Sequence, residues 1–270
     1  MYPILFKIGP LTIQTVSLFH SSAIFLGGFW VYHYAEKEKI NKEKVLEMLV
    51  LITIYSIIGA RVFSILFDGS LKWYLSNPLK MFALWNGGFT FYGGFIFGIV
   101  VGIWYIKKHR LNFWKLADLF APALALGLAV GRIGCFMSGD SYGKPSNLPW
   151  AVTFTNVHSS APLGIPLQPT QIYSVITNLL IFIALLWWKK KQKFTGELFL
   201  LFAILYSITR SFVEIFRNDP RGVYFGGIIS TSQIISFFVM LLSVFLYSKL
   251  KDKNKIKIKN QLSRSNIRRG

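Results

Sequence analysis

Residues 112–136 read NFWKLADLFAPALALGLAVGRIGCF and are followed by the polar loop MSGDSYG, residues 137–143. An apolar run of this length is sufficient for a helix to cross a bilayer. The stretch therefore predicts a membrane helix with Arg132 in its last turns. An arginine at membrane depth costs about 2.5–3.5 kcal/mol on insertion scales, so it is kept there for snorkelling or for binding. Glycines at 131, 134, 139 and 143 allow close approach to the backbone, and the whole pattern predicts an anion site at a membrane surface.

The composition extends this prediction to the rest of the chain. Its 270 residues are 53% hydrophobic and only 15% charged, with a mean hydropathy of +0.47, which excludes an ordinary soluble globular protein. We expect an all-α integral membrane protein in which residues 1–247 form a single transmembrane domain. Its seven expected spans are 11–34, 47–67, 88–106, 112–136, 171–188, 196–213 and 225–247.

The distribution of positive charge predicts the orientation of these spans. A net charge of +19 is compatible with nucleic-acid binding, but the basic residues fall in loops between spans rather than on one soluble face. Alternate loops carry 21 lysines and arginines, and the other loops carry six. This asymmetry places the amino terminus outside and the basic tail, residues 248–270, in the cytoplasm. The long loop of residues 137–170 is then an extracytoplasmic head, in which the alternation at 150–154 allows a short strand.

Three arginines lie inside expected spans, each near the outward end: Arg61, Arg132 and Arg210. Snorkelling explains a single arginine of this kind. Three at one depth, on the side that is otherwise poor in basic residues, favour a binding site. The native anion at that depth is a phospholipid headgroup, and guanidinium groups bind phosphate oxygens in pairs of hydrogen bonds.

Further candidates flank these arginines. Arg210, Glu214 and Arg217 are spaced i, i+4 and i+7, so a carboxylate lies between two guanidiniums on one helix face and either orients them or forms a plain structural salt bridge. Tyr92 precedes Gly93 and Gly94 at the outer end of a span, where it serves either as an interfacial tyrosine or as an acid–base group.

The single cysteine limits the chemistry that the chain can perform. Cys135 excludes an internal disulfide, and its thiol either acts as a nucleophile or packs at the helix end. We expect no metal site and no cofactor. The residues alone thus predict a protein that binds an anionic lipid in the outer leaflet, with arginines placed to stabilise charge on a departing phosphate.

The run Gly131-Arg132-Ile133-Gly134-Cys135-Phe136, with Gly139, Tyr142 and Gly143, resembles the signature of the bacterial prolipoprotein diacylglyceryl transferases. Further matches follow the same order along the chain: NPLK at 77–80, glycines at 87–88 and 93–94, QPTQIY at 168–173, and RSFVEIFR at 210–217 with Asp219. The seven spans and the outside amino terminus expected from the charge count agree with this family.

The resemblance implies an enzyme of the bacterial cytoplasmic (inner) membrane, with its active site facing the outer leaflet. It would move the diacylglyceryl group of phosphatidylglycerol onto the lipobox cysteine of a preprolipoprotein signal peptide and release glycerol phosphate. By position, Arg132 and Arg210 are the phosphate-handling arginines and Glu214 is the family's glutamate. The remaining candidates are expected to bind substrate: Arg61, Gly93, Gly94, Gly134, Cys135, Gly139, Asp140 and Arg217.

Four positions depart from the family pattern. Tyr92 replaces a histidine, Cys135 an asparagine and Asp140 a glutamate, while Thr15-Val16 replaces an aromatic pair. A phenol is a weaker base than an imidazole at neutral pH, although nearby arginines favour the phenolate. In the expected mechanism, Tyr92 accepts or relays the proton of the substrate thiol.

Two alternatives to this enzyme remain. A non-catalytic or differently specific relative that binds anionic lipid fits the four departures. A lipid transporter or scramblase fits less well, because the inward halves of the expected spans are apolar apart from Asp118.

Overall fold

The computed structural model describes residues 1–267 except 10, 68–70, 83–87, 220–222 and 225–228. The chain divides into two compact units. The first contains Met1–Trp30 and Trp114–Gly270, and the second contains Val31–Phe113.

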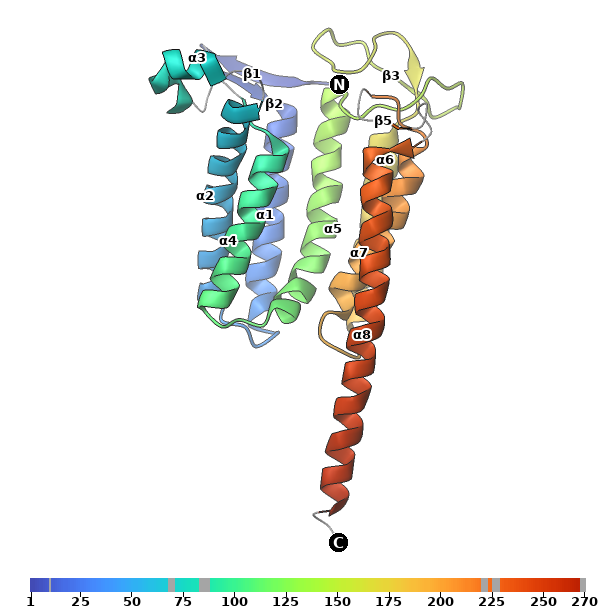
Figure 1. Ribbon diagram of the computed structural model, residues 1–270. Helices are drawn as coiled ribbons and strands as arrows, with labels where there is room; N and C mark the ends of the chain where they lie inside the picture. The colour runs from blue at the N-terminus through green and yellow to red at the C-terminus, as the bar shows by residue number, and fades with distance from the viewer. Residues whose placement is uncertain (10, 68–70, 83–87, 220–222, 225–228, 268–270) are drawn as a thin grey trace. The chain divides into compact units, whose positions relative to one another are not determined.

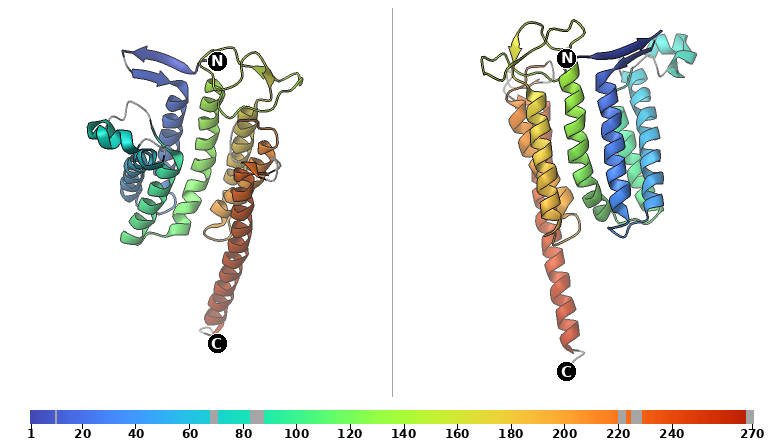
Figure 2. Two further views of the ribbon diagram at one scale, coloured as in Figure 1. Left: turned by 45° about the horizontal axis from the view of Figure 1, so that its top comes forward. Right: turned by 180° about the vertical axis from the view of Figure 1, so that it is seen from behind.

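Long helices dominate the first unit (Figures 1 and 2). They are α1 (Thr15–Ala35, most of which belongs to this unit), α5 (Phe113–Ser138), α6 (Thr170–Lys189), α7 (Glu197–Glu214) and α8 (Thr231–Ile267). α6 packs against α7, and α8 runs along α7. An apolar core joins α5, α6 and α7 through Ala121, Ala125, Ile181, Leu185, Leu198 and Phe202.

Small residues bring α1 and α5 into close contact. A Cβ atom at Gly134 would lie 2.6 Å from Cβ of Phe19, and one at Gly127 would lie 3.4 Å from the carbonyl oxygen of Ala23. Glycine at position 134 therefore sets how closely the two helices approach at the end of α5.

Two buried carboxylates, near the start of α5 and at the start of α7, tie the helices of this unit together. Asp118 accepts hydrogen bonds from Gln192 Nε2 (2.6 Å) and from the backbone N–H groups of Gly196 (2.6 Å) and Phe199 (3.0 Å). Glu197 accepts from Trp188 Nε1 (3.1 Å) and from the hydroxyl of Tyr247 (3.0 Å), among other donors. The turn between α6 and α7 is thus fixed to both α5 and α8.

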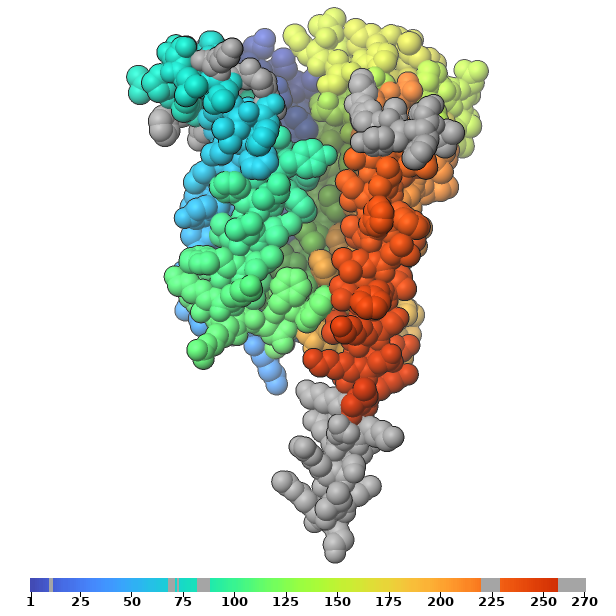
Figure 3. Space-filling model, in the orientation of Figure 1, coloured from blue at the N-terminus to red at the C-terminus, as the bar shows by residue number. Residues whose placement is uncertain are grey.

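The loop between α5 and α6 forms a small folded cap where α5 ends and α6 begins (Figure 3). Strand β3 (Val152–Thr153) pairs with β4 (Pro166–Leu167) in an antiparallel manner. The side chains of Phe154, Ala161 and Leu167 form a small buried core in this cap. The short strand expected within residues 150–154 is therefore confirmed.

Two further hairpins belong to the first unit. β1 (Ile4–Ile8) pairs with β2 (Leu11–Gln14), and β5 (Val223–Tyr224) pairs with β6 (Ile229–Ser230). Residues 11–14 were expected to begin the first membrane helix, but they pair with β1 instead, so α1 starts at Thr15. The expected start of the last span, at residue 225, lies outside the described residues.

The second unit contains α2 (Lys42–Phe67), α3 (Leu71–Ser76), the 3-10 helix η1 (Pro78–Phe82) and α4 (Phe91–Lys108). Asn41 caps α2, because its Oδ1 accepts from the N–H groups of Glu43 (2.9 Å) and Lys44 (3.0 Å). α2 and α4 pack closely, since a Cβ atom at Gly93 would lie only 2.3 Å from the carbonyl oxygen of Gly59.

Within the described residues, five helices are long and apolar enough to cross a membrane: α2, α4, α5, α6 and α8 over Thr231–Ile256. Two other long helices, α1 and α7, are not among these five and carry polar or charged residues. α1 contains Ser17, His20 and Ser21, and α7 contains Glu197, Arg210 and Glu214. The predominantly helical architecture with several apolar helices agrees with the expected membrane protein.

Candidate active site

Two arginines from different helices of the first unit line the same small pocket. α5 supplies Arg132 and α7 supplies Arg210. Arg132 also donates a hydrogen bond from Nη1 to Ser141 Oγ, 3.2 Å away in the loop that follows α5. The other residues that line this pocket are Ser174, Thr177 and Asn178 of α6 and Tyr206, Thr209 and Val213 of α7.

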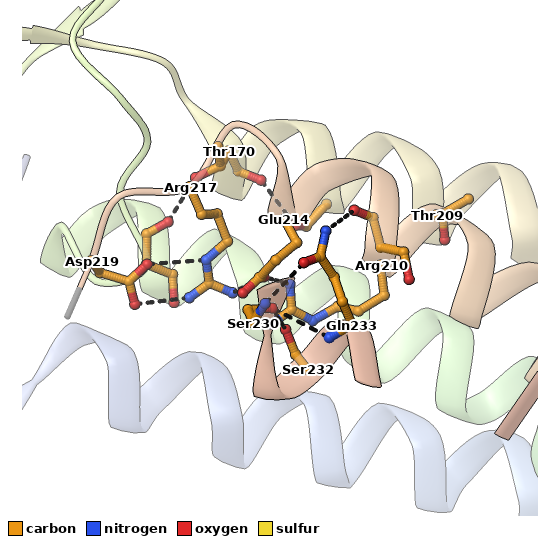
Figure 4. A network of polar contacts seen from close by, with 12 residues as sticks. Thr170, Thr209, Arg210, Glu214, Arg217, Asp219, Ser230, Ser232 and Gln233 are labelled. Carbon is orange, nitrogen blue, oxygen red and sulfur yellow. Dashed lines mark hydrogen bonds and ion pairs between the residues drawn. The ribbon is translucent and has the colours of Figure 1, made fainter. Parts of the chain in front are cut away.

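A chain of ion pairs continues from this pocket along the end of α7 (Figure 4). The carboxylate of Glu214 pairs with Arg210 on one side and lies 3.8 Å from Arg217 Nη1 on the other. Arg217 in turn donates to both carboxylate oxygens of Asp219, from Nε (3.1 Å) and from Nη2 (3.0 Å). The Glu214 side chain is only 4% exposed, so Arg210 and Arg217 help to balance a buried charge.

The loop after α5 is tied to both neighbouring helices. The carbonyl oxygen of Asp140 accepts from Gln171 Nε2 at the start of α6 (2.8 Å), and its carboxylate accepts from Ser138 Oγ (2.6 Å). Gly143 forms a β-bridge with Arg217 beyond the end of α7. These contacts build Asp140 into the loop, which holds the end of α5 next to the ion pairs of α7.

Gly139 permits the turn that begins this loop. Its φ of +80° lies in the left-handed region, and a Cβ atom there would lie 2.1 Å from Ser159 Oγ. A larger residue would be strained and would displace the cap above it.

Gly134 and Cys135 lie one turn from Arg132. Gly134 faces α1, as described above, while Cys135 is partly buried with a free thiol. The carbonyl oxygen of Cys135 accepts from the N–H of Asp140 (2.9 Å). The contacts of Gly134 thus favour a packing role. The carbonyl group of Cys135 takes part in the hydrogen bond that ends helix α5.

Arg61 belongs to the second unit and donates hydrogen bonds to backbone carbonyls. Its acceptors are the oxygens of Lys80 (2.8 Å), Met81 (3.0 Å) and Gly88 (3.1 Å), and its guanidinium lies 5.1 Å from the ring centre of Tyr74. At 5% exposure this guanidinium is enclosed by protein. The geometry favours a role in positioning Lys80, Met81 and Gly88 over direct contact with phosphate. Gly87, part of the sequence match, lies outside the described residues.

Tyr92, Gly93 and Gly94 also belong to the second unit. Tyr92 is 61% exposed in the first turn of α4, and its ring lies edge-on to that of Phe91. Gly93 and Gly94 face α2, where a Cβ atom at position 94 would lie 3.0 Å from the carbonyl oxygen of Ser56. Both glycines therefore support the packing of α2 against α4.

Comparison with known proteins identifies the family. The model of the prolipoprotein diacylglyceryl transferase family matches residues 3–249. The chain belongs to this family.

Individual transferases of the family are similar over most of their length. The phosphatidylglycerol–prolipoprotein diacylglyceryl transferase of Clostridium tetani is 36% identical over 248 residues, which cover 92% of this chain and 97% of the relative. The transferase of Finegoldia magna is 32% identical over 91% of this chain and 94% of its own. Transferase 2 of Clostridium perfringens is 38% identical over 78% of this chain and 81% of its own. The resemblance noted in the sequence is confirmed.

In this family member, the polar side chains of α6 were missed by the sequence analysis, which treated residues 171–188 only as a span. Ser174, Thr177 and Asn178 line the arginine pocket. Their i, i+3 and i+4 spacing forms a polar stripe on an otherwise apolar helix, and such a stripe is a signal of a buried polar surface. Within the described part of the chain, no group of three His, Cys, Asp or Glu side chains is placed to hold a metal ion.

Proposed function

We propose that this chain transfers the diacylglyceryl group of phosphatidylglycerol to the lipobox cysteine of preprolipoproteins and releases glycerol phosphate. Family membership and the names of its relatives support this activity. The structural observation that carries the proposal is that Arg132 and Arg210 line one pocket, whose free volume of about 10 Å³ means that the lining side chains move apart to admit a phosphate. Two guanidiniums are suited to hold the two unesterified oxygens of a phosphodiester.

In the proposed reaction, the substrate thiolate attacks the glycerol carbon that bears the phosphate ester. A C–S bond forms, the C–O bond breaks, and its electron pair goes to the phosphate oxygen, so the leaving group gains a negative charge. Arg132 and Arg210 stabilise that developing charge, which lowers the barrier of the chemical step. The thiol proton is relayed through the Tyr92 hydroxyl, which takes it on oxygen while giving its own proton to solvent, and the exposure of Tyr92 at the start of α4 leaves this hydroxyl accessible.

The other site residues have supporting roles in this proposal. Glu214 holds Arg210 and Arg217 in place through the ion pairs described above. The end of α5 and its loop are shaped by Gly134, Cys135, Gly139 and Asp140. Within the second unit, Gly93 and Gly94 let α4 pack on α2, and Arg61 holds backbone carbonyls through hydrogen bonds.

We further propose that the chain crosses the bacterial inner membrane seven times, through α1, α2 and α4–α8. The more polar α7 is compatible with this topology, because Glu197 stands at its first residue and Arg210 and Glu214 lie near its end, with an apolar stretch between them. The loop charges support a topology with the amino terminus and the cap outside and the basic tail in the cytoplasm. The pocket at Arg210 then faces the outer leaflet.

One experiment tests the activity directly. Purified protein is incubated with phosphatidylglycerol and a lipobox peptide, and the peptide is followed by mass spectrometry. We expect a mass gain of one diacylglyceryl group on the cysteine. A folded protein that leaves the peptide unmodified, and that also fails to restore growth of a transferase-depleted strain, would contradict the proposal and favour a non-catalytic lipid-binding relative.

A further inference from the structure

Asn178 lines the arginine pocket and carries a buried hydrogen-bond acceptor without a partner among the described residues. The residue is only 4% exposed and lines the pocket from α6. Its Nδ2 donates to the carbonyl oxygen of Ser174 (2.7 Å). Because a carbonyl oxygen can only accept, this contact fixes the orientation of the amide. Oδ1 is then left without a partner among the described residues, and an acceptor buried to this degree needs a donor from a ligand or from water.

Three hydroxyl groups that line the pocket together with Asn178 also donate their protons to backbone carbonyl oxygens. Ser174 Oγ donates to the carbonyl oxygen of Thr170 (2.9 Å), and Thr177 Oγ1 donates to that of Tyr173 (2.9 Å). Thr209 Oγ1, on α7, likewise donates to the carbonyl oxygen of Leu205 (3.0 Å). Each hydroxyl proton is used within its own helix, so these side chains offer lone pairs to any further partner.

The pocket therefore combines two kinds of surface. Arg132 and Arg210 supply positive charge and N–H donors, while the side chains of Asn178, Ser174 and Thr177 supply acceptors. A ligand that complements both is an anion that also carries hydroxyl groups. A headgroup with an ammonium group could donate to the acceptors, but the two guanidiniums would repel it.

We propose that Asn178, with Thr177 beside it, accepts hydrogen bonds from the hydroxyl groups of the lipid headgroup while the arginines hold its phosphate. This inference rests on the proposed function and deepens it. α6 becomes the specificity-determining wall that selects a phosphodiester lipid with a polyol headgroup. The wall acts on the leaving group, whose glycerol hydroxyls stay bound as the C–O bond breaks.

The test compares two lipids that differ only in these hydroxyls. Phosphatidylglycerol and phosphatidylpropanol share the phosphodiester and its charge, but the propanol headgroup has no hydroxyl donor. The kcat/KM for transfer to a lipobox peptide is measured with each lipid. We expect the native protein to prefer phosphatidylglycerol by about 10-fold or more, the effect of one well-placed hydrogen bond to a buried acceptor.

Two variants assign this preference to α6. Asn178→Leu keeps the approximate size of the side chain and removes the acceptor, so it should slow transfer from phosphatidylglycerol and leave that from phosphatidylpropanol nearly unchanged. Thr177→Val should reduce the preference by about 3-fold, because a weaker acceptor is lost. Thr53→Val is the matched control. The Thr53 hydroxyl also donates to a carbonyl one turn earlier, that of Leu49 (2.8 Å), but in α2, and its loss should leave the preference intact.

The outcomes separate this inference from the proposed function. Equal rates with both lipids in the native protein would overturn the inference and leave the transferase activity standing. Transfer from neither lipid would instead contradict the proposed function. If Asn178→Leu slows both lipids equally, the residue only packs the helices and the inference is wrong. If that variant does not fold, Thr177→Val decides, and an unchanged preference overturns the inference.

Discussion

Arg132 and Arg210 line one pocket, although the first lies near the end of α5 and the second near the end of α7. The core between α5, α6 and α7 holds these helices together, and the clamp at Asp118 fixes the turn that joins α6 to α7. The positions of the two guanidiniums therefore depend on packing along the whole length of the bundle.

Replacing either pocket arginine should abolish transfer. For Arg132→Ala and Arg210→Ala we expect kcat/KM to fall by about 100-fold or more, the usual effect of losing a donor that stabilises transition-state charge. Peptide modification by the purified variants measures this loss. Lys144→Ala removes an exposed positive charge from the cap and serves as control. Near-normal activity in either arginine variant would remove the phosphate-binding assignment.

Glu214→Gln should impair activity more than Asp219→Asn. Both changes replace a carboxylate by its amide, but the Glu214 side chain is 4% exposed and the Asp219 side chain is 19% exposed. Loss of the more buried charge removes the ion-pair partner of Arg210 and one partner of Arg217, which we expect to lower the free energy of unfolding by about 3 kcal/mol. Thermal unfolding in detergent and the transfer rate are measured together. Equal effects of the two changes would argue against the orienting role of Glu214.

Tyr92→Phe tests the proton step separately from folding. Since Tyr92 is 61% exposed, removal of its hydroxyl should leave the melting temperature unchanged. If the hydroxyl relays the thiol proton to solvent, kcat should fall by about 100-fold. Tyr55→Phe, at an exposed tyrosine of α2, provides the matched control. A full rate in Tyr92→Phe would restrict Tyr92 to packing.

Asp118→Asn should destabilise the protein at a distance from the pocket. The amide cannot accept all the hydrogen bonds that Gln192, Gly196 and Phe199 now donate to the carboxylate. We expect a loss of about 2–3 kcal/mol in the free energy of unfolding, as for other buried donors left unpaired. Denaturant unfolding measures it, with the exposed Asp252→Asn as control. A variant as stable as the native protein would show that the clamp is unnecessary.

Gly134→Ala and Gly27→Ala probe the same contact between α1 and α5. The new Cβ atom would lie 2.6 Å from Phe19 Cβ at position 134, but 3.6 Å from the Ala123 carbonyl oxygen at position 27. Gly134→Ala should therefore lower stability by about 1–3 kcal/mol through overpacking. Gly27→Ala should be tolerated, and equal melting temperatures for the two variants would contradict this account of the packing.

The amino-acid sequence by itself determined the kind of protein and most of its helices. Hydropathy is a local property, and a membrane helix satisfies its own backbone hydrogen bonds, so an apolar segment such as residues 112–136 indicates a helix without knowledge of its neighbours. α5, at Phe113–Ser138, lies close to that expectation. The ordered motifs around Arg132 and Arg210 were likewise enough to indicate the family.

Only the tertiary structure decided which side chains meet. Asn178 lines the pocket because of the rotation of α6 about its axis and the way α6 packs on α7, and these depend on contacts between distant segments. The same applies to Arg61, which the sequence grouped with the pocket arginines and which the fold surrounds with the carbonyls of residues 80, 81 and 88. A residue's depth in the membrane follows from its own segment, whereas its partners follow from the packing of all the others.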